Sequence, residues 1–153
     1  MNNEFIKARK DLFCHFEKGV NVVLSTSLND VVTSRTVTII AFKDALYLTS
    51  IKRPGAMKIA QIEKNPNVSI CLNTMQITGE SSIIGLASDE QNEEIMSVYK
   101  SNLPESYKRF EKIPGFVLIK IELLTCKDWK MVGSQIESSY IDFTSKTITK
   151  NII

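Results

Sequence analysis

Hydroxyl and cationic side chains gather in the segment Leu46–Pro66 of this chain. Its first residues, Leu46–Leu48, are apolar and typical of a short strand, and Thr49 and Ser50 follow them directly. The positively charged side chains come next: Lys52, Arg53 and Lys58. Hydroxyls and cations at the end of a strand are suited to binding an anion, so the segment predicts a phosphate-binding element.

A helix is expected over residues 54–64, because Pro54 suits the first helical position and Asn65-Pro66 ends the pattern. The first backbone N–H groups of a helix are unpaired, and its dipole is positive at that end, which favours a bound anion. Helical side chains lean toward the N-terminus, so Lys58 could reach the same anion. The alternative is a charged helix start that simply faces solvent.

Arg35 is a further cation that needs an explanation, because it lies inside the strand-like, mostly apolar segment Val31–Lys43. An arginine in a buried strand needs an acidic partner or a bound anion. Its planar guanidinium can bind a phosphate through two parallel hydrogen bonds. A salt bridge to Asp or Glu at a sheet edge is the alternative interpretation.

Composition narrows the class of protein. The 153 residues are 43% hydrophobic and 24% charged with a net charge of +2, which is typical of one globular domain, residues 1–153, and gives no reason to expect nucleic acid as a partner. No apolar run is long enough to span a membrane, and the charged N-terminus is unlike a secretory signal. Three scattered cysteines (Cys14, Cys71, Cys126) and a single histidine, His15, favour a reducing cytoplasm and no metal site.

The hydrophobic pattern predicts an α+β, mainly β fold: a six- to seven-stranded antiparallel barrel with flanking helices. Helices are expected over Asn3–Glu17, 54–64, Ser88–Ser101 and Pro104–Lys112. Strands are expected over Val20–Leu28, Val31–Lys43, Ala45–Ser50, Val68–Leu72, Met75–Ala87 and Phe116–Leu124, followed by a polar loop, Gly133–Ser139, and a terminal hairpin, Tyr140–Phe143 with Thr147–Ile152. Gly79, inside one strand, predicts a bulge or bend.

Three blocks in this order resemble the pyridoxamine 5'-phosphate oxidase-like family of FMN-binding split barrels, and most of all its short bacterial, general-stress-protein-like members. They are Leu24-Ser25-Thr26 with Ser34-Arg35-Thr36-Val37, then Leu46–Ser50 with Lys58, then Asn65–Ile70. The resemblance covers roughly residues 4–130. It implies FMN as the cofactor and a homodimer with the flavin at the interface.

The resemblance also implies roles for particular residues. Lys58 and Arg35 match phosphate contacts, and Thr49 and Ser50 match hydroxyl positions at the end of the third strand. The other matches are the neighbours of the isoalloxazine ring, Thr36, Val37 and Thr38, and two residues expected from the second subunit, Gln76 and Trp129.

The implied activity is that of an FMN-dependent oxidoreductase or reductase with a small-molecule electron donor and acceptor. Met57, Ile39-Ile40 and a C-terminal stretch without the substrate arginine depart from true pyridoxamine phosphate oxidases, which argues against the vitamin B6 reaction. No side chain stands out as acid, base or nucleophile, so no catalytic residue is assigned. The alternatives are a non-catalytic protein that binds or senses flavin, deazaflavin or haem, and a ligand-free structural dimer in which Arg35 and Lys58 pair with carboxylates.

Overall fold

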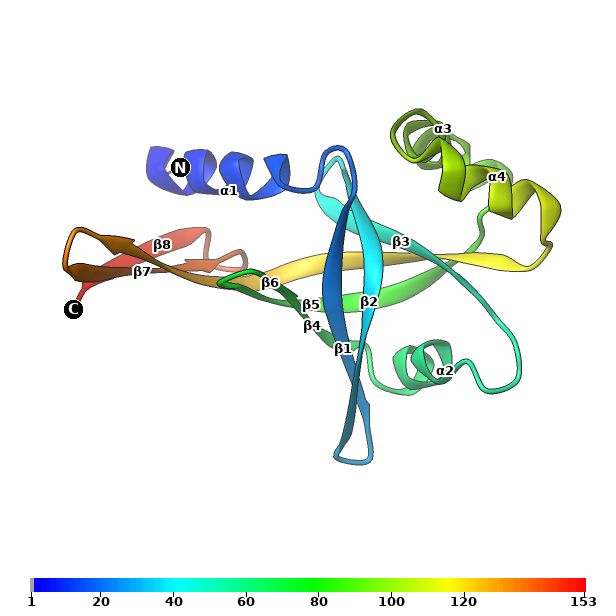
Figure 1. Ribbon diagram of the computed structural model, residues 1–153, viewed down its shortest axis with the longest axis horizontal. Helices are drawn as coiled ribbons and strands as arrows, with labels where there is room; N and C mark the ends of the chain where they lie inside the picture. Colours follow the sequence, from blue (N-terminus) through cyan, green and yellow to red (C-terminus); the bar gives the residue numbers. More distant parts are fainter. Residues whose placement is uncertain (1) are drawn as a thin grey trace.

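A computed structural model describes residues 2–153 and shows a mainly β, α+β fold built on one antiparallel sheet of eight strands (Figure 1). The strands are β1 (Val20–Leu28), β2 (Val31–Phe42), β3 (Ala45–Ile51), β4 (Asn67–Leu72), β5 (Met75–Leu86), β6 (Phe116–Val132), β7 (Gln135–Asp142) and β8 (Thr147–Ile152). Their spatial order is β3-β2-β1-β4-β5-β6-β7-β8, and β3 also pairs with β6. That pairing closes the first six strands into the expected barrel, and β7 and β8 extend beyond it.

The β1–β2 hairpin follows from its turn residues. Asn29 and Asp30 both have positive φ angles, 51° and 64°, which a two-residue turn with the twist of the flanking strands requires and which Asn and Asp tolerate. The register is set by this turn, and Leu28 pairs with Val31. Thr26 consequently lies opposite Thr33.

The barrel is only partly closed between β2 and β3. Their ladder has only three residue pairs and ends where Ile40 pairs with Tyr47. Beyond that point β3 pairs with β6, from Leu46 to Ile51, while β2 continues along β1. Figure 1 shows the two strands diverging, so within residues 2–153 no strand pairs with the β3-side edge of β2 from Val31 to Ile39.

Gly79 marks a β-bulge, as the sequence predicted. The register of β5 against β6 shifts between Thr78 and Gly79. A Cβ atom at Gly79 would lie 2.6 Å from Cγ2 of Ile121 and 2.8 Å from the backbone oxygen of Glu122. Glycine is therefore required here by the close approach of β6.

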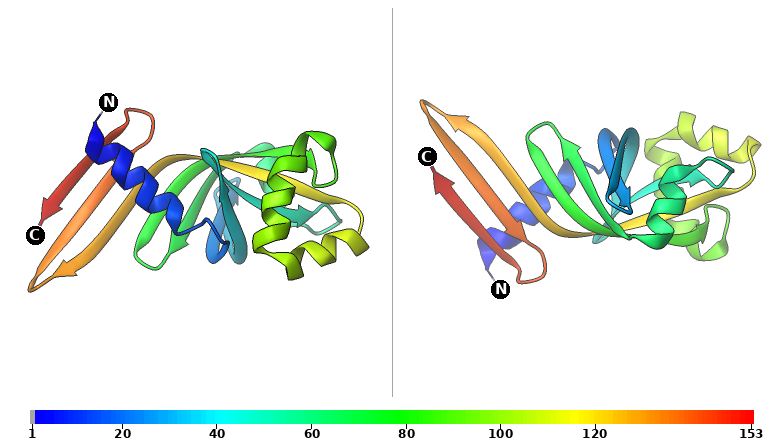
Figure 2. Two further views of the ribbon diagram at one scale, coloured as in Figure 1. Left: turned by 90° about the horizontal axis from the view of Figure 1, so that it is seen from above. Right: turned by 90° about the horizontal axis from the view of Figure 1, so that it is seen from below.

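Four α-helices flank the sheet in the part of the chain that the structure describes: α1 (Asn3–Cys14), α2 (Met57–Lys64), α3 (Glu93–Asn102) and α4 (Pro104–Lys112). Figure 2 shows α1 across the β6–β8 sheet at one end of the molecule and α3 with α4 at the other. The main core fills the barrel and continues beneath α1, and a second core lies under α3. Among residues 2–153 we find no helix whose length and hydropathy would let it span a bilayer.

Two expectations about elements were wrong. The helix expected from Pro54 begins at Met57, because Gly55, with a φ of +82°, turns the chain before it. The expected polar loop Gly133–Ser139 is largely strand: β6 continues to Val132 and β7 starts at Gln135. The polar residues of β7 hide this strand in the sequence, and its pairing with β6 over eight residue pairs makes it form.

Candidate phosphate and flavin site

A cavity of about 310 Å³ lies where the end of β3 meets the start of α2. Three cationic side chains from three different segments line it: Arg35, Arg53 and Lys58. Its remaining lining residues are Ser50, Ile51, Gly55, Ala56 and Met57, so the lining includes no carboxylate. Three cations without a counter-charge are matched to an anion such as a phosphate group.

Arg35 is held by neutral groups inside the barrel. Its Nη1 donates to the Leu24 carbonyl oxygen at 3.2 Å and to Thr26 Oγ1 at 2.8 Å. Its Nη2 donates to Thr33 Oγ1 at 2.6 Å and to Gln61 Oε1 at 3.4 Å. Burial lowers the pKa of the guanidinium. The edge salt bridge considered from the sequence does not occur, because within residues 2–153 no carboxylate lies within ion-pair distance of Arg35.

Lys58 is the second residue of α2, earlier in the helix than the sequence predicted, and it is half-buried. Burial, together with the nearby Arg35 guanidinium, lowers the pKa of its amine below the ordinary range. Within the described chain Lys58 has no acidic partner either. Within one described chain, Arg35 and Lys58 therefore lack the carboxylate partners that the ligand-free dimer alternative expects.

The two hydroxyl residues at the end of β3 point in different directions, as successive residues in a strand must. Ser50 lines the cavity. Thr49 instead lies 3.4 Å, Oγ1 to Oη, from Tyr99 of α3, whose pKa is raised chiefly by burial. The structure therefore places Ser50, but not the Thr49 side chain, with the three cations.

The residues predicted to border the flavin ring alternate across β2. Arg35 pairs with the buried Leu24 and faces the barrel interior, whereas Thr36 is exposed on the outer face. Val37 lies on the inner face, and Thr38 Oγ1 donates to Asn21 Oδ1 at 2.7 Å on the outer one. Their backbone lies along the edge of β2 that β3 leaves open. A flat ring could therefore meet main-chain N–H and C=O groups there.

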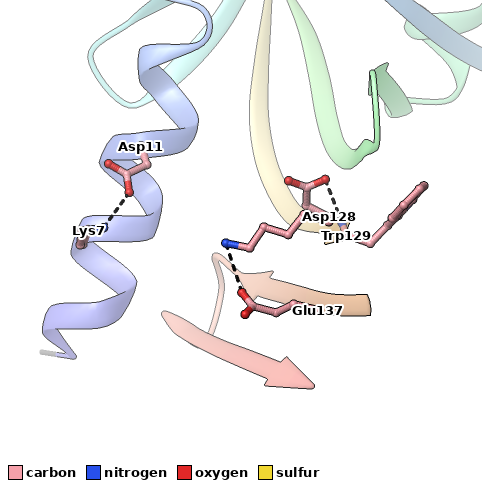
Figure 3. Close-up of polar contacts among 6 residues, drawn as sticks. Lys7, Asp11, Asp128, Trp129 and Glu137 are labelled. Atoms are coloured by element: carbon pink, nitrogen blue, oxygen red, sulfur yellow. Dashed lines mark hydrogen bonds and ion pairs between the residues drawn. The ribbon is translucent and has the colours of Figure 1, made fainter. Parts of the chain in front are cut away.

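Gln76 and Trp129 do not line the cavity. Gln76 lies on the outer face of the sheet, in one cross-strand row with Thr36, Val23, Cys71, Lys127 and Tyr140. Trp129 is 44% exposed, two residues beyond Lys127 on β6. In Figure 3 its backbone N–H donates to the Asp128 carboxylate and its indole points away from α1.

The sequence pattern does not reveal the residues that position Arg35. Gln61, buried on α2, accepts hydrogen bonds through Oε1 from the Thr26 and Thr33 hydroxyls. Those two hydroxyls in turn accept from the guanidinium. The Asn29-Asp30 turn already places Thr26 opposite Thr33, so the sequence predicts that these two hydroxyls are neighbours. It does not predict that Gln61 of α2 joins them.

Comparison with known proteins identifies the fold. No protein-family model and no curated protein sequence matches the chain. Among solved structures, general stress protein 26 of Bacillus anthracis is 25% identical and superposes with a TM-score of 0.57, covering 79% of this chain and 91% of that one. A pyridoxamine 5'-phosphate oxidase-related, FMN-binding protein of Nostoc punctiforme is 14% identical with a TM-score of 0.58, covering 99% and 95%.

The chain has the pyridoxamine 5'-phosphate oxidase-like split-barrel fold. HutZ, a haem storage protein of Vibrio cholerae, is also similar to this split barrel, with 13% identity, a TM-score of 0.60 and coverage of 76% and 89%. The fold resemblance recognised in the sequence is thus confirmed.

Proposed function

We propose that this split barrel binds FMN, with the flavin phosphate in the cavity between Ser50 and the start of α2. The observation that carries the proposal is the set of three cations, Arg35, Arg53 and Lys58, that line one cavity with no carboxylate among its lining residues. A phosphate monoester carries a charge of about −1.5 to −2 at neutral pH and accepts several hydrogen bonds. Its charge would offset the burial and, to a smaller extent, the repulsion from Arg35 that together lower the pKa of Lys58.

The ring of the flavin would lie along the open edge of β2. There the backbone of Thr36–Thr38 has no strand partner on the β3 side within the described chain, so its N–H and C=O groups can bond to a ligand. Similarity to the FMN-binding protein of Nostoc punctiforme supports the same cofactor.

We further propose that the functional unit is a homodimer formed through the outer face of the sheet. Along the row from Thr36 to Tyr140 every residue is exposed and only Lys127 is charged. Val23, near one end of this row, is apolar and 41% exposed. A broad exposed face with so few charges is suited to pairing with a second copy. Gln76 and Trp129 would then contact the flavin from the partner.

The proposed activity is electron transfer between a small-molecule donor and a small-molecule acceptor, for which bound FMN supplies the redox chemistry. The chain's own residues would bind and orient the cofactor. Lys58 and Ser50 would hold the phosphate, and the β2 backbone would position the ring.

The visible spectrum of the purified protein, before and after FMN addition and desalting, tests the proposal. Retained flavin absorbance near ~370 and ~450 nm supports it, and anaerobic titration with NADH and NADPH then tests for turnover. A protein that stays colourless after FMN addition contradicts flavin binding. A bound flavin that no donor reduces supports a flavin-binding protein without turnover.

Haem is the second candidate ligand, favoured by the similarity to HutZ. The only histidine, His15, is exposed just after α1 and does not line the cationic cavity. A parallel titration with haemin separates the two ligands. Haem would be favoured if the wild-type protein does not retain FMN but gives a haem spectrum, and if the His15→Ala variant loses that spectrum.

A further inference from the structure

The guanidinium of Arg35 has little capacity left for a ligand. An arginine side chain has five N–H donors, of which four belong to the two terminal nitrogens. In Arg35 these two nitrogens already bond to four acceptors of the protein: the Leu24 carbonyl oxygen, the Thr26 and Thr33 hydroxyls and Gln61 Oε1. The two-point phosphate contact expected from the sequence would require breaking this network. Arg35 therefore acts on an anion in the cavity mainly through its charge.

Arg53 lines the same cavity and is exposed. Within residues 2–153 no carboxylate lies within ion-pair distance of it. Its neighbour Lys52 differs, because its Nζ lies 2.6 Å from Glu63 Oε1 of α2. Of the two adjacent cations, one is thus paired with α2 and the other is available to a ligand.

The loop before α2 is folded so that Arg53 stays close to the cavity. The Ala56 N–H donates to the Arg53 carbonyl oxygen at 3.0 Å, and the Met57 N–H donates to the Gly55 carbonyl oxygen at 2.9 Å. Gly55, at a φ of +82°, permits this turn, which a residue with a Cβ would adopt only with strain. The Arg53 and Lys58 side chains consequently line one cavity from the two sides of the turn.

We infer that Arg53 forms the two-point contact with the terminal phosphate of FMN, with Lys58 as a second charge and Arg35 as a fixed background charge. Arg53 would thereby determine the preference for a phosphate monoester. Uncharged riboflavin lacks the group entirely, and in FAD the same phosphate is joined to AMP through an anhydride bond and so loses the second negative charge of the monoester. This inference rests on the proposed function, since it specifies how the same cavity selects its ligand.

Equilibrium titrations followed by flavin fluorescence test the inference, with FMN, FAD and riboflavin as probes. The proteins are the wild type, Arg53→Ala, Arg53→Lys and, as the matched control, Lys52→Ala. We expect Arg53→Ala to weaken FMN binding by about 10- to 100-fold, the range for losing a hydrogen bond to a charged group, and to leave riboflavin affinity unchanged. The FMN affinity of Arg53→Lys should lie between those of the wild type and Arg53→Ala. Lysine keeps the positive charge but lacks the paired N–H donors of the guanidinium.

The outcomes separate the two proposals. Wild-type protein that binds none of the three flavins contradicts the proposed function and this inference with it. Wild-type protein that binds FMN, together with an Arg53→Ala variant of equal FMN affinity, overturns the inference alone. Equal losses of FMN and riboflavin affinity would also overturn it, because they indicate damage to the ring site. Since Arg53 is an exposed loop residue, thermal unfolding should confirm that the variants remain folded.

Discussion

At the scale of single residues, the cationic cavity combines features that oppose folding. Arg35 and Lys58 are like charges in one cavity, and burial lowers the pKa of both side chains. Neither has an acidic partner among residues 2–153. Unpaired, partly buried cations are unfavourable in the empty protein and become favourable once an anion binds. Function and stability should therefore respond to Lys58 in opposite directions.

Replacing Lys58 by methionine tests this opposition. Lys58→Met keeps the long side chain and removes the charge, so the apoprotein should unfold at a higher temperature than the wild type. FMN affinity should fall by about 10- to 100-fold, because a charge-assisted contact is lost. Thermal unfolding and flavin fluorescence measure the two effects. Lys64→Met, an exposed position on the same helix, is the control and should change neither.

The lowered pKa of Lys58 also predicts a pH dependence. The amine is charged below its folded-state pKa and neutral above it, so FMN should lose affinity relative to riboflavin as the pH rises through that value, which lies below the ordinary ~10.4. Measuring the FMN-to-riboflavin affinity ratio removes effects on the ring itself. Lys58→Arg should keep the ratio flat, since arginine stays charged, whereas a flat ratio in the wild type would count against a role for Lys58.

Stability of the apoprotein should move the other way over the same pH range. The folded state binds the Lys58 proton less tightly than the unfolded chain does, so the unfolded state holds more protons between the two pKa values. The contribution of Lys58 to the free energy of unfolding therefore rises with pH between its folded-state pKa and its unfolded-state pKa. Urea unfolding of the wild type against Lys58→Met isolates this contribution.

At the scale of elements, local signals predicted the strands whose partners are close in sequence. The β1–β2 hairpin follows from Asn29-Asp30, and the β5 bulge follows from Gly79. The pairings of β1 with β4 and of β3 with β6 depend on strands far apart in the chain, which periodicity does not reveal. For the same reason Arg35 and Lys58 were found in the sequence, whereas Gln61, which joins α2 to Arg35, was not.

Gly79 offers the prediction that belongs to this scale. A methyl group there would lie 2.6 Å from Ile121 Cγ2 and 2.8 Å from a backbone oxygen, and the backbone cannot yield as a side chain can. We expect Gly79→Ala to lower the free energy of unfolding by about 1–3 kcal/mol, the range for overpacking. Urea denaturation measures it. Ser82→Ala, at an exposed position on the same strand, should have little effect, and equal stability of both variants would refute the packing argument.

At the scale of the whole molecule, five of the predicted cofactor residues fall into two separate groups. Arg35, Ser50 and Lys58 line the cavity, whereas Gln76 and Trp129 lie on the outer face of the sheet and do not. A cavity of about 310 Å³ in one chain has room for the phosphate end of FMN and leaves the ring to be covered by something else. The sparsely charged face that carries Gln76 is the surface that a second copy would present.

The single tryptophan makes this arrangement measurable. If Trp129 of the partner lies beside the flavin, FMN binding should quench its fluorescence in the dimer. Val23→Lys places a charge on the proposed interface and should yield a monomer in sedimentation analysis, with weaker FMN binding and little quenching. Ile113→Lys, at a similarly exposed apolar position after α4, should leave the wild-type assembly and the quenching intact. If Val23→Lys stays dimeric and FMN still quenches its Trp129 fluorescence as in the wild type, the dimer interface does not include Val23. A wild-type monomer that still quenches on FMN binding would instead mean that Trp129 reaches the flavin of its own chain.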